Sequence, residues 1–387
     1  MTSRERMRRA MRPRAGELPD RVPVMCQLAL GHYFLHAGLE PADIWHDSSA
    51  FAEALLLLQR RYGFDGVLVN LPGRDPAWRD DIRSVDARGA ERAECVIHWT
   101  CGLCTVVPPD DNPHAFDPTG APRRRHAWAA VDPGALYYLE PHGMFGPTPI
   151  AAGQWPAWQH ATIRTVRARA PECSVHGEIF SPFSQLLEWV DCAEALLALV
   201  EDAQRVQACL DALADGAIDL GVGQAEAGAD AILISSAFAG GGFISPRQYR
   251  AFVLPCERKV IAGIKARCQG LPVYTHTCGA IGDRLELMEE TGTDGIDTLD
   301  PPPLGTGDLA DAKRRLGGRL FIKGNLDPVG TLLIGTPEAC YAASLERLAT
   351  GKPGGGYILS TACSVAPHTP PENIAQLHRA ADAAGRY

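Results

Sequence analysis

The amino-acid sequence predicts an α/β protein whose strands and helices alternate to form a closed (β/α)8 barrel. Three observations favour this fold class. Short apolar runs are each followed by a stretch with helical periodicity, which requires right-handed crossovers and a parallel sheet. No glycine-rich phosphate-binding turn follows these runs, although a doubly wound sheet would usually show one. The chain has 387 residues, 46% of them hydrophobic, which is enough for the core of one barrel.

Eight short runs rich in aliphatic and β-branched residues are predicted to be strands. In chain order they cover residues 22–28, 66–69, 174–180, 231–235, 272–277, 295–299, 320–323 and 357–360. Helices are predicted over residues 48–62, from the end of the third strand to 227, from Pro246 onward, and over 281–290, 308–316, 337–348 and 371–384. Eight parallel strands at this spacing close naturally into a barrel.

Residues 75–163 interrupt this alternation. The segment is rich in Pro, Gly, Asp and Arg, and its clearest local pattern is a hairpin over 95–107. We therefore predict a single barrel over residues 1–387, with 75–163 as a lid-like insertion between strands 2 and 3. The arginine-rich start of the chain lacks the apolar core of a secretory signal and is predicted to be a surface helix.

Composition excludes several classes of protein. The formal net charge of −9 argues against nucleic acid or an anionic membrane as the main partner. No run of about 18 apolar residues is present to span a bilayer. Twelve cysteines in a chain of this length are too few for a disulfide-stapled scaffold, so we predict a reducing cytoplasm with the cysteines as thiols or metal ligands.

The sharpest chemical pattern is His276-x-Cys278 at the end of the fifth predicted strand. Side chains two apart on a strand share a face, and the carboxyl ends of barrel strands form the mouth where substrates bind. Cys363 follows the last strand, which lies at the same height. One imidazole and two thiolates suit Zn²⁺, and three protein ligands leave a fourth position open, as in catalytic sites.

Simpler interpretations of these residues stay open. Free cysteine is a common core residue, and a buried histidine often only satisfies a backbone carbonyl. A second cluster, His98, Cys101 and Cys104, could be half of a structural zinc site or a redox pair. Structural zinc needs a further ligand pair nearby, and Cys95 is the only other cysteine of the insertion.

Several segments resemble one known family. The stretches DRVPV at 20–24, KGNLDP at 323–328 and PHTPPEN at 367–373 are similar to the uroporphyrinogen decarboxylase superfamily. The resemblance implies a (β/α)8 barrel and two branches: cofactor-free decarboxylases of the heme pathway, and zinc-dependent, corrinoid-linked methyltransferases that carry H-x-C and a distant cysteine.

Departures from the decarboxylase pattern favour the methyltransferase branch. Decarboxylases have arginines after strand one, where this chain reads MCQLALGH over 25–32. They place an essential aspartate where this chain has Asn70, and G-H-G where it has Ala362-Cys363-Ser364. A porphyrinogen with eight carboxylates would be left with much unmatched negative charge.

Further residues at strand ends are candidates for supporting roles. The long interval between Cys278 and Cys363 is close to that of cobalamin-independent methionine synthases, whose zinc has a glutamate ligand on the following strand. Asp300 ends that strand here and is a candidate fourth or outer ligand, or only a loop cap. Glu178 could orient substrate or relay a proton, and further candidates for substrate binding at other strand ends are His32, Asn70 and Asn325.

The sequence therefore predicts a zinc-dependent methyltransferase. Its partners would be a corrinoid (methylcobalamin) protein, because the chain has no corrinoid-ligating motif, and a small thiol or methylated substrate. The alternatives are a porphyrinogen decarboxylase that needs no metal, and a non-enzymatic barrel that only binds metal or corrinoid.

Overall fold

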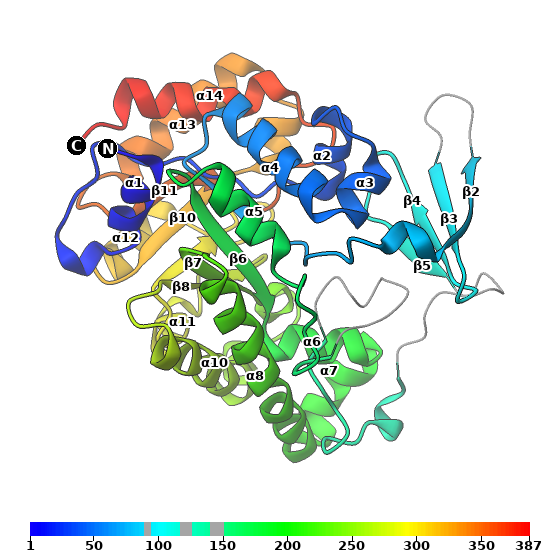
Figure 1. Ribbon diagram of the computed structural model, residues 1–387. Helices are drawn as coiled ribbons and strands as arrows, with labels where there is room; N and C mark the ends of the chain where they lie inside the picture. The colour runs from blue at the N-terminus through cyan, green and yellow to red at the C-terminus, as the bar shows by residue number, and fades with distance from the viewer. Residues whose placement is uncertain (89–93, 117–125, 140–150) are drawn as a thin grey trace.

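A curled parallel sheet forms the centre of the molecule (Figure 1). The computed structural model describes residues 1–88, 94–116, 126–139 and 151–387. The sheet has seven strands in the order β1-β6-β7-β8-β9-β10-β11. Their bounds are β1 Gly66–Val69, β6 Ser174–Phe180, β7 Ala231–Ser235, β8 Val273–Thr277, β9 Gly295–Thr298, β10 Phe321–Leu326 and β11 Tyr357–Thr361. The predicted fold class, an α/β barrel, is confirmed.

The eighth predicted strand position is filled by an extended segment rather than by a regular strand. Residues 22–28 lie between β11 and β1, where Val24 and Leu28 form isolated parallel bridges with Leu359 and Val365. On the other side, the Asp65 amide donates to the Val24 carbonyl at 2.7 Å. Pro23 has no N–H to donate, so this segment cannot make the full ladder of a strand. The prediction of a strand over 22–28 was therefore wrong in detail, although its position between the neighbours is as expected.

Helices surround the sheet and mostly follow the predicted segments. Many begin at a side chain that accepts from the first helical amides, such as Asp47, Ser181 and Asp308. The helices are α1 Ser3–Ala10, α2 Leu30–His36, α3 Pro41–His46, α4 Ser48–Tyr62, α5 Ala161–Arg169, α6 Pro182–Trp189, α7 Cys192–Glu201, α8 Ala203–Glu226, α9 Pro246–Gln248, α10 Leu254–Arg267, α11 Leu285–Glu290, α12 Leu309–Leu316, α13 Pro337–Gly351 and α14 Pro371–Ala384. Shorter turns include η2 Trp78–Asp81 and η6 Tyr249–Val253.

Helix α1 closes the amino-terminal end of the barrel. Its buried face carries Met7, which belongs to a small apolar cluster with inward-facing residues of the strands, among them Leu68, Tyr274 and Phe321. Arg6 on the same helix donates to the buried Asp65 at 2.6 Å. The arginine-rich start, predicted as a surface helix, therefore packs one face against the barrel and covers its floor.

The insertion forms a second sheet. Its antiparallel strands run in the order β2-β3-β4-β5, with bounds β2 Ile82–Arg88, β3 Glu94–Trp99, β4 Cys104–Val107 and β5 His114–Phe116. The predicted hairpin over 95–107 corresponds to β3 and β4. In Figure 1 this sheet stands to one side of the barrel, beside α3. None of the helices in the described part of the chain combines the length and the hydropathy of a membrane-spanning segment.

A buried carboxyl group lies among the helices outside the sheet. Glu257 of α10 is fully buried and accepts a hydrogen bond from the Tyr249 hydroxyl at 2.9 Å. Burial disfavours the charged form and raises the pKa of Glu257 to about 7, although the hydrogen bond acts in the opposite direction. The native state therefore holds this proton at pH values where the unfolded chain has released it.

The pKa of Glu257 predicts a pH-dependent stability. Because the pKa of Glu257 is higher in the native state than in the unfolded chain, its contribution to the free energy of unfolding is fully present below about pH 4.5. This contribution declines as the pH rises and is lost above about pH 7, which lowers the free energy of unfolding by about 3 kcal/mol. Glu257→Gln removes this titration while keeping an acceptor for Tyr249. We expect Tm to fall less between pH 5 and pH 8 in the variant than in the parent. Parallel Tm curves for the two proteins would contradict the assignment.

Candidate metal centre

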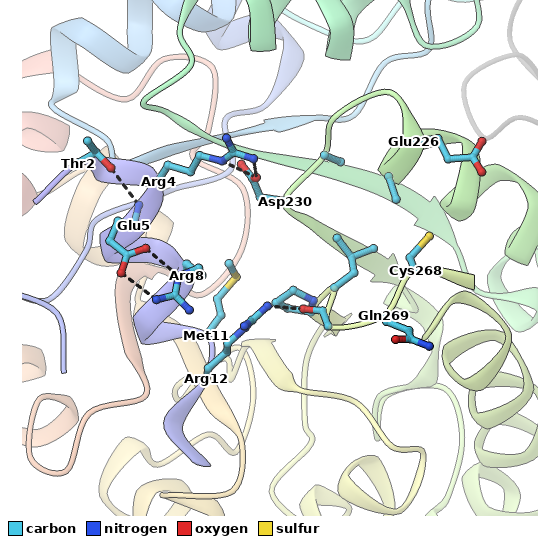
Figure 2. A pocket seen from close by; sticks show the side chains of 15 residues that line it. Thr2, Arg4, Glu5, Arg8, Met11, Arg12, Glu226, Asp230, Cys268 and Gln269 are labelled. Carbon is cyan, nitrogen blue, oxygen red and sulfur yellow. Dashed lines mark hydrogen bonds and ion pairs between the residues drawn. The ribbon is translucent and has the colours of Figure 1, made fainter. Parts of the chain in front are cut away.

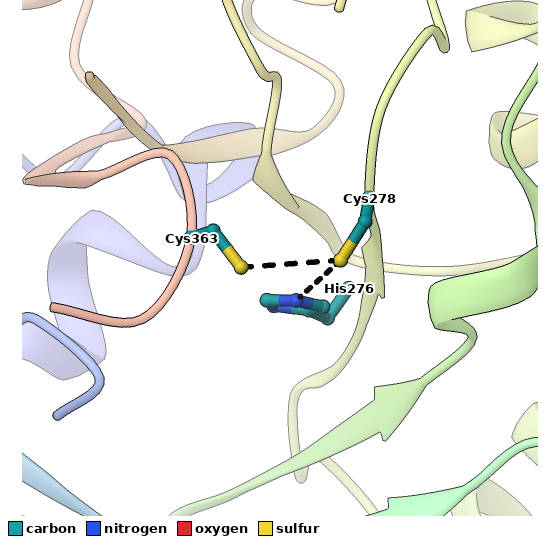
Figure 3. Close-up of side chains that lie close together, drawn as sticks. All are labelled: His276, Cys278 and Cys363. Atoms are coloured by element: carbon teal, nitrogen blue, oxygen red, sulfur yellow. Dashed lines mark hydrogen bonds between the residues drawn. The ribbon is translucent and has the colours of Figure 1, made fainter. Parts of the chain in front are cut away.

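Three potential metal ligands meet at the carboxyl ends of two strands (Figure 3). His276 lies near the end of β8, Cys278 follows that strand, and Cys363 lies two residues beyond β11. Their ligand atoms all lie within 4.8 Å of one another, and the described residues contain no other such group of three or more histidine, cysteine or acidic side chains. The structure thus brings together the three residues proposed from the sequence, although Cys278 and Cys363 are 85 positions apart.

The distances between these atoms fit a tetrahedral zinc ion. The Cys278 Sγ lies 3.9 Å from the Cys363 Sγ and 3.4 Å from the His276 Nε2. Around tetrahedral zinc, two sulfurs lie roughly 3.8 Å apart, and a sulfur and a nitrogen roughly 3.5 Å apart. The two thiols are too far apart for a disulfide, whose S–S bond is about 2.05 Å. The ligand set therefore matches zinc in both chemistry and spacing.

Behind His276 lies a buried chain of charged groups. Strand pairing places Asp297 of β9 directly between His276 and Lys323 of β10. One Asp297 oxygen accepts from the Lys323 ammonium at 2.8 Å, and the other lies 3.1 Å from the His276 Nδ1. All three side chains are at most 6% exposed. Because Nδ1 donates to the carboxylate, Nε2 is left to face the two sulfurs.

The charges in this cluster shift the pKa values of its members. Burial alone would lower the pKa of His276, but hydrogen bonds to Asp297 and Cys363 raise it to about 10. The contact with Cys278 and the neighbouring His276 hold the pKa of Cys363 at about 4, whereas the same sulfur–sulfur contact raises the pKa of Cys278. Burial acts to raise the pKa of Asp297, yet Lys323 and His276 hold it at about 2. The cluster therefore favours one thiolate beside a cation.

Asp300 lies beside the cluster on a strained turn. Thr298 and Leu299 have positive φ angles of 83° and 54°, which non-glycine residues rarely adopt. The Asp300 Oδ2 accepts from the amide of Gly279, the residue after Cys278, at 2.5 Å. Its Oδ1 is buried without a hydrogen-bond partner among the described residues, and burial raises the pKa of the group. Asp300 is not one of the three clustered ligands but carries a free acceptor next to them.

The remaining predicted residues lie in different surroundings. The Asn325 amide donates to the Leu299 carbonyl at 2.9 Å and so holds the strained turn. Asn70 and Glu178 line one cavity of about 10 Å³, together with residues at the start of α5 and Gln224 of α8, and the three ligands do not border it. Glu178 is 8% exposed. These two residues therefore lie apart from the three ligands.

His32 is placed where it cannot line a substrate pocket. The side chain is fully buried, and its ring nitrogens lie 2.9 Å from the Pro367 carbonyl and 2.8 Å from the Tyr62 hydroxyl. Burial lowers its pKa to about 4. The structure thus gives His32 the role of fastening α2 to the segment after β11.

A cavity at the opposite end of the barrel is unrelated to this centre (Figure 2). It is lined by Arg4 of α1, by Arg12 just after that helix, and by Asp230 and Pro272, which precede β7 and β8. Arg4 is paired with Asp230, and Arg12 donates to the Gly270 carbonyl. Conserved function in such barrels belongs to the carboxyl ends of the strands, so this cavity is a feature of the floor.

Sequence reasoning did not assign roles to Asp297 and Lys323. The sequence nevertheless held a signal for both residues. Each lies in a predicted strand that is otherwise mostly apolar, and charged residues are almost never fully buried unless they are paired. What could not be read from the sequence was the register that sets them opposite each other.

The fold is that of the α/β-barrel enzymes, and the candidate site lies at the carboxyl ends of the strands, where such enzymes carry their chemistry. A family model described as uroporphyrinogen decarboxylase (URO-D) matches residues 147–384. This match covers more than half of the chain, and the protein belongs to the uroporphyrinogen decarboxylase family.

Individual relatives agree with this membership. The uroporphyrinogen decarboxylase of Psychromonas ingrahamii is 34% identical over 174 residues, which cover 44% of this chain and 46% of that protein. That of Thioalkalivibrio sulfidiphilus is 31% identical over 183 residues, covering 46% and 49%. The chain thus spans about half the length of the curated relatives it matches. A methyltransferase structure from Methanosarcina mazei superposes with a TM-score of 0.69 over 99% of both chains at 18% identity, a likeness of fold.

The buried chain behind His276 predicts a large effect of removing its cation. Lys323→Met removes the ammonium partner of the buried Asp297 carboxylate, which then keeps only its hydrogen bond with His276, and we expect a loss of about 3–5 kcal/mol in the free energy of unfolding. The double variant with Asp297→Asn should recover much of this loss, because no charge is then buried alone. The measurement is denaturant unfolding of the full chain.

A matched control separates burial from ion pairing. Lys259 pairs with Asp211 at 2.8 Å on the surface, and Lys259→Met should cost less than about 1 kcal/mol. Equal losses for the two lysine variants would show that Lys323 does not neutralise a buried charge.

Proposed function

We propose that this protein is a zinc-dependent methyltransferase that moves a methyl group between a corrinoid (methylcobalamin) protein and a small thiol or methylated substrate. The observation that carries the proposal is the convergence of His276, Cys278 and Cys363 at distances that suit tetrahedral zinc. Three ligands leave a fourth position for a substrate atom, which distinguishes catalytic from structural zinc sites.

The chain's own groups fit the roles that this chemistry needs. His276 would bind through Nε2, since Asp297 engages Nδ1, and the two cysteines would bind through their sulfurs. A zinc ion held by these residues would act as a Lewis acid, so that a thiol bound to it would ionise near neutral pH. The Asp300 Oδ1 is a free acceptor beside the ligands and can take the proton that the substrate thiol releases.

Other candidate substrate-binding residues lie apart from the three metal ligands. Asn70 and Glu178 would orient a small substrate only after a rearrangement, because the cavity that they line has a volume of about 10 Å³, room for about one water molecule. Methyl transfer in either direction uses the same ligands: a substrate thiolate can accept the methyl group from the corrinoid, or a methylated substrate can donate it.

We further propose that residues 75–163 act as a lid over the mouth of a single barrel domain. The segment after β4 reaches the stretch that follows Cys363, where the His368 Nε2 lies 2.9 Å from an oxygen of Asp110. Gly31 of α2 also packs so closely against the Asp110 backbone that a Cβ would lie 2.0 Å from its carbonyl oxygen. A lid fastened at this point would help to exclude water from the mouth.

A second candidate function is a metal-free porphyrinogen decarboxylase. The observation that favours it is the name shared by the relatives at 31–34% identity. Against it, the segment 25–32 contains no arginine, and Asn70 stands where the decarboxylase pattern has an aspartate. Carboxylates of a porphyrinogen would find few cations there. The two candidates also differ in their dependence on metal.

The first prediction from this proposal is zinc content. Purified protein should contain about one zinc per chain, and Cys363→Ser should lower the zinc affinity by more than the roughly 10–100-fold typical of losing an outer-shell partner. Affinity is measured by competition with a chromophoric chelator. Cys268→Ser, a half-exposed cysteine on the outside of the barrel, is the control and should leave affinity unchanged.

The second prediction is methyl transfer itself. With free methylcobalamin and a panel of small thiols, the zinc-loaded protein should consume methylcobalamin, followed by its change in absorbance, and Cys363→Ser should abolish this activity. A stable protein that holds no zinc and turns over uroporphyrinogen would instead establish the decarboxylase. Zinc binding without turnover of any thiol would leave only a metal-binding barrel.

A further inference from the structure

A second cluster of reactive side chains crosses the β2–β5 sheet of the insertion. Strand pairing sets His98 of β3 opposite Cys104 of β4, and Cys104 opposite Phe116 of β5. Directly opposed residues of antiparallel strands point to the same face. Asp86 of β2 lies on this face as the diagonal neighbour of His98. The row thus holds a thiol between an imidazole and an aromatic ring.

Hydrogen bonds link the three polar members in series. The Cys104 Sγ lies 3.2 Å from the His98 Nδ1, and the His98 Nε2 lies 2.9 Å from an oxygen of Asp86. A carboxylate only accepts, so the imidazole donates from Nε2 and its Nδ1 accepts from the thiol. Nucleophile, base and orienting carboxylate in this sequence are the arrangement by which proteins activate a thiol or hydroxyl.

This arrangement is not needed to attach the sheet to the barrel. The opposite face does that, through the buried Ile97 and Trp99, with the Trp99 ring in contact with those of His46 and Trp78. On the face of the cluster, His98 is 29% and Asp86 is 60% exposed. Exposed ion pairs of this kind contribute little stability.

The cluster also lacks the composition of a metal site. Asp86 and Cys104 contact opposite ring nitrogens of His98, and no three ligand atoms of the described residues here lie within 4.8 Å of one another. Cys101, the other cysteine of the motif, lies exposed in the turn before β4 and does not complete a group of three ligands with His98 and Cys104. The residues thus fit a nucleophile better than a bound cation.

We propose that Cys104 is a nucleophilic thiol, activated by His98 and oriented by Asp86, that reacts with low-molecular-weight disulfides. In this step the Cys104 proton moves to the His98 Nδ1 and the sulfur attacks one sulfur of the disulfide. A new S–S bond forms to Cys104, the old S–S bond breaks, and the second sulfur leaves as a thiolate that takes up the proton. The product is a mixed disulfide on the insertion, independent of the zinc centre.

The chain contains its own control for this proposal. Cys101 is more exposed than Cys104 and lies three residues away, so exposure alone predicts that Cys101 reacts faster. We treat the full-length protein with oxidised glutathione at pH 7 and follow each cysteine by site-resolved mass spectrometry. Cys104 should form the mixed disulfide about tenfold faster than Cys101. In denaturant the two rates should become similar.

Variants of His98 and Asp86 test the roles of these two residues. His98→Gln should slow Cys104 about tenfold without changing Cys101, and Asp86→Asn should have an intermediate effect. Ser84→Ala, opposite His98 but outside the hydrogen-bonded series, is the matched control and should react as the parent does. Tryptophan fluorescence, to which Trp78 and Trp99 contribute, reports whether the sheet is intact. If His98→Gln changes this fluorescence, the rate of Asp86→Asn decides the result.

Two results would overturn the proposal: Cys104 reacting no faster than Cys101 in the folded parent, or an unchanged Cys104 rate in both partner variants with an intact sheet. Neither result bears on the proposed zinc centre, because mass spectrometry follows Cys278 and Cys363 on peptides other than those that carry Cys101 and Cys104.

Discussion

The ion pair between Lys323 and Asp297, deep inside the barrel, is the constraint on which the site depends. The Asp297 carboxylate uses one oxygen for the ammonium and the other for His276, so the buried ion pair fixes the orientation of the oxygen that His276 contacts. The imidazole is thereby held with Nε2 toward the two sulfurs. Adjacent strands supply all three groups at one height, which makes the position of His276 a consequence of strand register.

The barrel interior is divided along its axis. Near the floor, Met7 of α1 meets Tyr274 and Phe321 in an apolar cluster that closes the amino-terminal end. Two residues further along the same strands stand His276 and Lys323, where polar groups begin. This change from apolar to polar follows from the two-residue repeat of a strand, and it leaves the chemistry facing the end where Asp300 and Cys363 lie. The strained backbone at Thr298 and Leu299 brings Asp300 to that end.

Much of the fold could be predicted from local pattern. The strands β6 and β7 and helix α4 have the predicted bounds, because alternating burial and helical periodicity are local properties. The segment 22–28 has the apolar composition of a strand, but Pro23 and the lack of a full ladder reduce it to isolated bridges. His32 illustrates the opposite error: its residue type suggested a binding role, while its surroundings make it a buried link between α2 and Pro367.

The sequence by itself determined the α/β class and the alternation of elements, which depend on residue type and short-range spacing, and it supplied the three candidate metal ligands through their residue types at strand ends. Only the tertiary structure decided that Cys363 reaches Cys278 and that Lys323 neutralises Asp297. Those contacts join positions 85 and 26 residues apart, and they arise from the closure and register of the sheet. Hydrogen-bonded pairing between strands, rather than any local preference, sets that register.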